Sequence, residues 1–145
     1  MRLKFMWGEI VIAGRKVGAE HPPFIVAEAG LNHNGSMGCA LSMIHQAKAA
    51  NCDAIKFATF KADEFCAKDD PLYGAFKDAE LPSDSWSTIK DECGRAGIIF
   101  FSTPQNASDL ELLLDVGVPA IKVGSDDLTN LALIHSYAQH GLPII

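Results

Sequence analysis

Several features that identify large classes of protein are missing from this sequence. The longest run of basic residues is the pair Arg15 and Lys16, and the net charge is −6. A surface that attracts nucleic acid or an anionic membrane requires clustered lysine and arginine, so we expect neither as a partner. The first apolar stretch is interrupted by Gly8 and Glu9 and followed by Arg15, which predicts neither a signal peptide nor a membrane span. We therefore expect a cytoplasmic protein.

Signatures of bound cofactors are missing as well. The four cysteines, at positions 39, 52, 66 and 93, include no pair at the CxxC spacing of zinc and redox sites. We expect free thiols, because disulfides are rare in reducing compartments. No GxGxxG sequence follows an apolar run, which removes support for a dinucleotide-binding fold.

What the sequence does contain is a regular alternation of short apolar runs and longer segments with helical spacing. The apolar runs, expected to be strands covered on both faces, occupy 24–28, 54–58, 98–102 and 120–123, and a last one opens at 143. Because one βα unit repeats, we predict an α/β fold, a partial TIM (β/α)8 barrel of about four and a half units. A doubly wound sheet fits the same alternation. A complete barrel needs at least about 200 residues, and this chain has 145.

Individual residues indicate where the helices begin and end. Ser36 and Ser83 are suited to cap the first two helices, because a serine hydroxyl can accept a hydrogen bond from the first turn. The four helices are expected to end at Asn51, Gly97, Gly117 and Gly141. A strand is predicted directly after each of these positions, as a parallel sheet with crossover helices requires.

Two segments lie outside the repeat. Residues 9–17 form two short alternating stretches around an Ala-Gly-Arg turn, which predicts an N-terminal β-hairpin closing the floor of the barrel. Residues 60–82 form a long, charged connection with Pro71, Gly74 and Pro82, between the second strand and its helix. Barrels keep their chemistry in the loops on that side of the strands.

Polar residues gather where the predicted strands end. They are Glu28, Lys56, Thr103, Lys122 and Ser125. Two ammonium groups, two hydroxyls and the flexible backbone at Gly124 could together hold a phosphate and a carboxylate, the two anionic groups of phosphoenolpyruvate. Either lysine taken alone could be a surface cation, and a strand lysine in an apolar barrel could also form a Schiff base.

Acidic residues and one histidine complete the set of candidates. Glu28 could neutralise the lysines or accept a proton from a substrate hydroxyl or water. Asp126 and Asp127 could accept a sugar hydroxyl, stand beside a metal, or cap the fourth helix. His33 lies in a polar loop after the first strand and has no second histidine at ligand spacing, so a hydrogen-bonding role is favoured over metal ligation.

Four segments resemble, in order and spacing, the N-terminal barrel of the sialic acid (N-acetylneuraminate) synthases. They are FIVAEAGLNHNG, DAIKFATFKADEF, IIFFSTPQN and VPAIKVGSDDLTNLALI, and the match spans residues 10–145. The same family includes legionaminate, pseudaminate and spore-coat polysaccharide synthases. The resemblance implies that residues 1–145 are the N-terminal portion of such a barrel, without the C-terminal half-barrel and the antifreeze-like domain.

The resemblance also implies an activity. It is the condensation of phosphoenolpyruvate with the open-chain aldehyde of N-acetylmannosamine or a related amino sugar, with release of phosphate. Lys56, Thr103, Lys122 and Ser125 would bind phosphoenolpyruvate, Glu28 would be the catalytic acidic residue, and Asp127 would contact the sugar. A divalent metal, manganese or magnesium, would polarise the aldehyde, with ligands from later strands that this chain does not contain. Full-length members are expected to be homodimers.

The sequence departs from the family in ways that bear on activity. Ala58 stands where the family has a glutamine that reaches the sugar, and Asp127 stands where sialic acid synthases have glutamate. Both changes could alter the sugar that is accepted. Because the chain stops before the barrel closes, we expect weak or no activity of these residues alone. The alternatives are a noncatalytic remnant that binds an anionic or phosphorylated ligand, and a Schiff-base aldolase.

Overall fold

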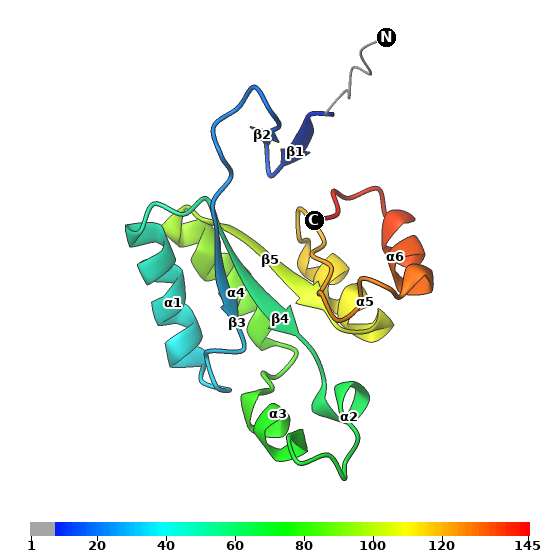
Figure 1. Ribbon diagram of the computed structural model, residues 1–145. Helices are drawn as coiled ribbons and strands as arrows, with labels where there is room; N and C mark the ends of the chain where they lie inside the picture. The colour runs from blue at the N-terminus through cyan, green and yellow to red at the C-terminus, as the bar shows by residue number, and fades with distance from the viewer. Residues whose placement is uncertain (1–7) are drawn as a thin grey trace.

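The computed structural model describes residues 8–145, and its central element is a parallel sheet. The strands β3 (Val26–Gly30), β4 (Ala54–Thr59) and β5 (Ile99–Pro104) lie in the order β3-β4-β5 (Figure 1). These strands confirm the first three predicted from the sequence, each shifted by no more than two residues. Because β4 is hydrogen-bonded on both sides, all six of its residues are buried.

The fourth and fifth predicted strands are not regular strands. Residues 120–123 and 143–145 continue the parallel order through two single bridges, Ser102 with Ile121 and Ile121 with Ile144. The backbone bond from Lys122 N to Ser102 O is long, at 3.5 Å. The prediction of a regular strand over 120–123 was therefore wrong, because these residues pair with their neighbours only through single bridges. After Val123 the chain bends away at Gly124, and Pro143 has no N–H to donate to a ladder.

The predicted N-terminal hairpin is confirmed. Strands β1 (Ile10–Ile12) and β2 (Arg15–Val17) pair antiparallel around Ala13 and Gly14, which have φ of 48° and 81°. Two successive left-handed residues are the requirement of the two-residue hairpin turn that matches strand twist. Figure 1 shows the hairpin at the end of the sheet where the strands begin. Arg15 forms an ion pair with Asp53 there, and donates to the carbonyl of Pro23 at 2.9 Å.

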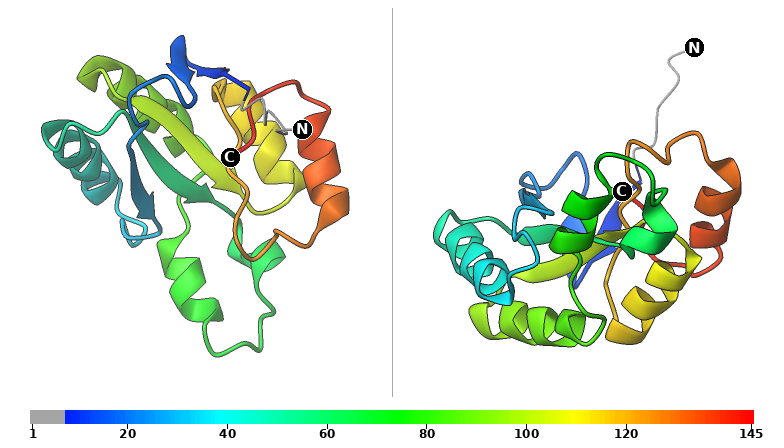
Figure 2. Two further views of the ribbon diagram at one scale, coloured as in Figure 1. Left: turned by 45° about the horizontal axis from the view of Figure 1, so that its top comes forward. Right: turned by 90° about the horizontal axis from the view of Figure 1, so that it is seen from below.

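The long helices cover one face of the sheet (Figures 1 and 2). They are α1 (Met37–Ala49), α4 (Ser85–Ala96), α5 (Ala107–Val116) and α6 (Leu131–Ala138). Ser36 caps α1 through a bond from the Cys39 N–H, as predicted. Gly97 and Gly117 end α4 and α5 in the left-handed conformation, also as predicted. None of the helices among residues 8–145 is long and apolar enough to span a membrane.

Two predicted helix ends were wrong, and one open alternative, a cap at Asp126 or Asp127, is excluded. The N-cap of α4 is Asp84 rather than Ser83, and its side chain makes no capping bond. The N-cap of α6 is Asn130, which accepts a bond from the Leu133 N–H, so neither Asp126 nor Asp127 caps this helix. Their segment forms a tight turn, in which the Asn130 N–H bonds to the Asp127 carbonyl and delays the helix. At its other end α6 stops at Gln139, before Gly141.

The hydrophobic core lies between the sheet and its helices. Ile55, Phe57 and Phe100 of the sheet pack with Ile44 of α1 and Ile89 of α4. A second cluster joins Leu110 of α5 and Tyr137 of α6 to Ile121 and Val123. Because strand side chains alternate between faces, the residues between these core positions point to the opposite side. We call that side the site face, and it carries Glu28, Lys56, Ala58, Thr103 and Lys122.

Residues 60–82, here called the insert, lie at the end of the sheet where the strands finish (Figure 1). The insert contains two short helices, α2 (Ala62–Phe65) and α3 (Tyr73–Ala79), and a small core of its own. The buried members are Phe60, Ala62 and Ala79, with Leu31, Tyr73 and Phe76 packed against them. The long connection predicted from the sequence is thus a folded unit rather than an open loop.

Candidate active site

Two of the predicted site residues form an ion pair across neighbouring strands. Glu28 of β3 and Lys56 of β4 are register partners, and the Lys56 Nζ lies 2.7 Å from the Glu28 Oε1. The lysine side chain is 10% exposed because β4 is the central strand, whereas the glutamate on edge strand β3 is 60% exposed. An ammonium group in such a buried position needs a partner, and Glu28 provides it.

Thr103 carries a buried polar atom with no partner in this structure. It lies on β5 opposite Ala58, and Ala58 follows Lys56 by two residues on β4. Its hydroxyl oxygen makes no hydrogen bond to any residue from 8 to 145. Buried hydroxyls are nearly always satisfied, so an orphaned one at a strand end indicates a place for a ligand or water. The unpartnered hydroxyl is the observation that bears on Thr103, and its role in binding stays a prediction.

Gly124 lies in the backbone close to Thr103. A Cβ at this residue would lie 2.1 Å from Oδ1 of Asp126, an exposed side chain that can rotate away, and at an ordinary contact distance of 3.5 Å from Cγ2 of Thr103. This close approach brings main-chain groups beside the threonine, in the way that ligand-binding loops often use glycine.

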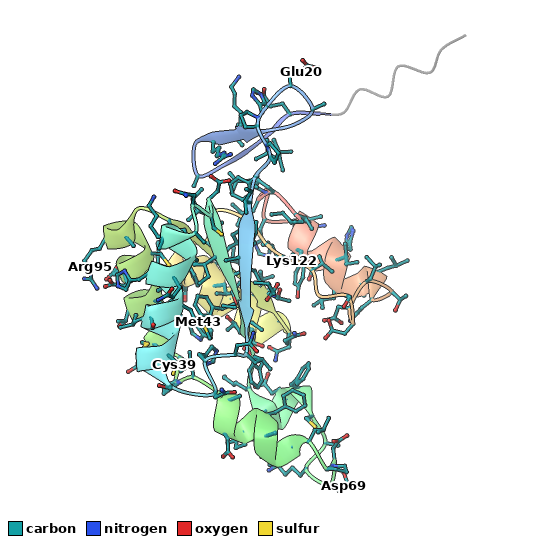
Figure 3. The ribbon with its side chains drawn as sticks, turned by 60° about the vertical axis from the view of Figure 1, so that its left-hand side comes forward. Glu20, Cys39, Met43, Asp69, Arg95 and Lys122 are labelled. Atoms are coloured by element: carbon teal, nitrogen blue, oxygen red, sulfur yellow. The ribbon has the colours of Figure 1, made fainter. Side chains whose placement is uncertain are left out.

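Lys122 is the second lysine of the site face. Ile121 and Val123 face the helix core, so the residue between them points the other way. Figure 3 shows Lys122 on the opposite side of β3 from the α1 residues Cys39 and Met43. Its Nζ donates to the Val123 carbonyl. No carboxylate within residues 8–145 forms an ion pair with it, in contrast to Lys56.

The remaining predicted residues lie in the turn that follows. Ser125 is exposed and, in the described part of the chain, makes no side-chain hydrogen bond to another site residue. The Asp127 carboxylate accepts a 3.3 Å bond from the Asn130 side chain, so it already has one local partner. The structure brings Glu28, Lys56, Thr103 and Lys122 to one face, but places Ser125 and Asp127 at its border.

Two buried polar residues lie near the strand ends: His33, for which the sequence favoured a hydrogen-bonding role, and Asp109, which sequence reasoning did not identify. His33 is buried against Phe57, with ring centroids 6.0 Å apart, and burial lowers its pKa. Its Nδ1 accepts the Gly35 N–H at 3.2 Å, which leaves the proton on an unpartnered Nε2. Asp109, in the first turn of α5, is 1% exposed. The only sequence signal for Asp109 was its position three residues after the N-cap Asn106, the spacing of a capping box.

The described residues do not provide a metal centre. Within residues 8–145, no three His, Cys, Asp or Glu side chains lie together in a way that could hold a metal ion. His33 has one nitrogen bonded to the backbone and the other buried without a second ligand nearby. The proposal that the metal ligands come from other parts of the protein remains a prediction.

With this geometry in place, comparison with known proteins identifies the family. Residues 43–145 match the NeuB family. The chain belongs to the NeuB family. It is 34% identical to spore coat polysaccharide biosynthesis protein SpsE of Bacillus subtilis, and 32% identical to the N,N'-diacetyllegionaminic acid synthase of Legionella pneumophila and to human N-acetylneuraminate-9-phosphate synthase. These matches cover 84–92% of this chain but only 38–40% of the relatives.

Solved structures of NeuB relatives have the same arrangement of elements. The N-acetylneuraminic acid synthetase of Leptospira borgpetersenii, solved with citrate, superposes with a TM-score of 0.90 at 34% identity, over 95% of this chain and 48% of that one. SpsE of Bacillus subtilis gives 0.80 at 32% identity, over 94% and 39%. A truncated 3-deoxy-D-arabino-heptulosonate 7-phosphate synthase of Thermotoga maritima, 12% identical, shares the fold with a TM-score of 0.67. The α/β fold is thus that of these synthases.

Proposed function

We propose that this chain is the first part of a TIM barrel that condenses phosphoenolpyruvate with an amino sugar to form a nonulosonic acid. The chain spans about two fifths of the curated relatives it matches, so the rest of the barrel would supply further strands. Strand β3 pairs only with β4 in the described sheet. Its other edge would close the barrel, because closure removes unpaired strand edges.

The observation that carries this proposal is the contrast between the two lysines beside Thr103. The charge of Lys56 is balanced by Glu28 at 2.7 Å, whereas Lys122 has no carboxylate partner in residues 8–145. One uncompensated ammonium next to an orphaned hydroxyl attracts an anion. We assign phosphoenolpyruvate binding to Lys56, Thr103 and Lys122, with Ser125 able to join from the adjoining turn. Asp127 would contact the sugar.

The reaction we propose is the one that the family resemblance implies. C3 of phosphoenolpyruvate forms a bond to the aldehyde carbon of the sugar, and the aldehyde oxygen takes up a proton. Water adds at C2, and cleavage of the C2–O bond then releases inorganic phosphate, so that the three reactants become one acid and phosphate. Glu28, half exposed beside Lys56, is positioned to accept the proton of the water that attacks C2.

Two details concern the acceptor and the metal. Ala58 lies between Lys56 and Thr103 on the site face and offers no polar group, which favours a sugar that needs no hydrogen bond there. Manganese or magnesium would bind through residues of the later strands. A homodimer in the cytoplasm belongs to the same proposal.

The Schiff-base alternative is less consistent with the geometry. A Schiff base requires a neutral amine, and the Lys56 ammonium is held in an ion pair with Glu28. Lys122 has no such ion pair within residues 8–145, so borohydride trapping of pyruvate on Lys56 or on Lys122 would contradict the proposal. The noncatalytic alternative has the same anion site, so it is separated from the enzyme by turnover rather than by binding.

The test is calorimetric titration of phosphoenolpyruvate into the protein at low salt with manganese present. Lys122→Ala should abolish the binding heat, because it removes the uncompensated charge. Lys16→Ala is the matched control, since this lysine lies in the hairpin at the other end of the strands and pairs with Glu9. Equal affinity in both variants and the parent would refute the assignment of Lys122. No binding by a folded parent would show that the site needs further strands.

A further inference from the structure

The insert is joined to α5 by a cluster of polar groups in which hydrogen-bond acceptors outnumber the protons that reach them. Ser108 Oγ lies 3.0 Å from Oε2 of Glu64 in α2, and 2.8 Å from Oδ1 of its own helix cap, Asn106. Both of these oxygens are acceptors, and the serine hydroxyl has one proton. Only one of the two contacts can be a full hydrogen bond at a time. We call Glu64, Gln105, Asn106, Ser108 and Asp109 the junction cluster.

Two more acceptors in the junction cluster have no donor at all. Gln105 Oε1 and Asp109 Oδ2 are buried without a hydrogen-bond partner in the described residues. The unpartnered Asn106 Nδ2 does not reach either of them within hydrogen-bond distance. Burying an acceptor without a donor destabilises the arrangement, and a buried carboxylate is the most costly case. A proton added to Asp109 would remove this buried charge.

The charges that surround Asp109 come from two neighbouring elements. Glu64 and Lys61 face it from α2 and its N-cap, and Tyr137 faces it from α6. Burial and, after it, the negative charge of Glu64 raise the pKa of Asp109 to about 6. Lys61 and backbone N–H groups of Gln105 and Asn106 oppose this shift without cancelling it. Tyr137 donates its own hydroxyl proton to the Pro104 carbonyl at 3.0 Å, so it does not serve Asp109.

We propose that the junction cluster is a proton-sensitive latch, which holds the insert on α5 when Asp109 is protonated and loosens it when Asp109 is charged. The insert also packs on the loop after β3, because Leu31 belongs to its small core. It therefore bridges the ends of β3 and β5 on the side where the strands finish (Figure 1). Loosening the latch would change access to that side of the sheet.

The sign of the effect follows from proton linkage. The docked state binds the Asp109 proton more tightly than a released, solvated state, whose pKa would return toward the usual 3.8. Docking is thus strongest at low pH, weakens as the pH rises from about 4 through about 6, and levels off near about pH 7. With a pKa of about 6 in the docked state and 3.8 in the released state, loss of the Asp109 proton weakens docking by up to about tenfold between pH 5 and pH 7.

Hydrogen exchange of the protein tests the latch directly. Protection factors for the amides of α2 and α3, corrected for the chemical exchange rate, should fall by up to about tenfold from pH 5 to pH 7. In Asp109→Asn the fall should disappear, and protection at pH 7 should at least match that of the parent at pH 5. Asp115→Asn, an exposed carboxylate on the same helix, is the matched control and should behave as the parent.

Two results would overturn the proposal. One is equal protection of the parent insert at pH 5 and pH 7, and the other is an unchanged pH dependence in Asp109→Asn. If Asp109→Asn does not fold, Glu64→Gln removes the neighbouring charge and adds a donor from the other side of the junction. It should raise insert protection at pH 7 above that of the parent, and an unchanged value would also contradict the latch.

Discussion

The sheet with its helices and the insert are stabilised in different ways. In the sheet layer, Ile44, Phe57 and Ile89 are completely buried, and the core continues through both neighbouring strands. The small core of the insert has only three buried members, and the insert leaves Leu72 59% exposed at its surface. In the insert, polar and charged contacts stand in place of the apolar burial found in the sheet layer. Asp63 contacts Tyr73 at 2.8 Å, Lys68 at 3.1 Å and Lys77 at 3.3 Å.

Because of this difference, salt and pH should affect the insert and the sheet layer differently. Apolar burial does not depend on salt or pH over the ordinary range, whereas exposed ion pairs are screened by salt. The Tyr73 hydroxyl, together with Lys68 and Lys77, lowers the pKa of Asp63 to about 2. The sheet layer should therefore unfold as one cooperative unit, while the insert opens at a lower free energy.

The largest effect is expected from a cavity in the sheet layer. Phe57→Ala should lower the free energy of unfolding by about 3–5 kcal/mol, because the ring is fully buried and contacts Trp86 and Phe100. Leu72→Ala in the insert is the control and should change stability by less than about 0.5 kcal/mol. Urea unfolding followed by circular dichroism measures both. Similar losses in the two variants would remove the distinction between the regions.

An intermediate effect is expected where the two regions meet. Gly35 has φ of 72°, and a Cβ there would lie 2.1 Å from the carbonyl oxygen of Asp78 in the insert. Gly35→Ala should cost about 2–3 kcal/mol through backbone strain and displacement of the insert. Gly74→Ala is the matched control, because position 74 has open space and lies within α3. It should be neutral or slightly stabilising in the same unfolding assay.

The smallest effect is expected from removing the charge at the centre of the insert. Asp63→Asn should reduce the exchange protection of α3 amides at low salt and leave the sheet layer unchanged. The loss should shrink at 1 M salt, and it should also shrink as the pH falls from about 4 toward about 2, where the parent carboxylate becomes protonated. Asp69→Asn, at the tip of the insert (Figure 3), is the control. A loss that spreads into β4 would show that the insert is not a separate unit.

The sequence did not predict the hydrogen bonds that join neighbouring helices. Lys48 of α1 donates to the Gly97 carbonyl at the end of α4 at 2.8 Å, and Lys90 of α4 donates to the Val116 carbonyl at the end of α5. Both lysines satisfy carbonyls that a helix end leaves free, and they complement the helix dipole. From the sequence they were indistinguishable from solvent-exposed charges.

Local signals therefore determined much of the fold. The strands near 26, 54 and 99, the cap at Ser36 and the stops at Gly97 and Gly117 were predictable, because each depends on residues within about one helical turn or on strand alternation. The start of α6 could not be predicted, since Asp126 and Asp127 were possible caps and only the tertiary structure selects Asn130.

The candidate site shows the same division between features that follow from the local sequence and features that depend on the tertiary structure. The sequence by itself determined which strand ends carry Glu28, Lys56, Thr103 and Lys122, because parallel strands bring their ends to one side of a sheet. Only the tertiary structure decided that Glu28 neutralises Lys56 and not Lys122. It also decided that the Thr103 hydroxyl has no partner among residues 8–145, and that Asp109 is buried beside the insert. Burial and pairing depend on groups 28 to 44 residues apart in the chain, and no local pattern records which of them meet.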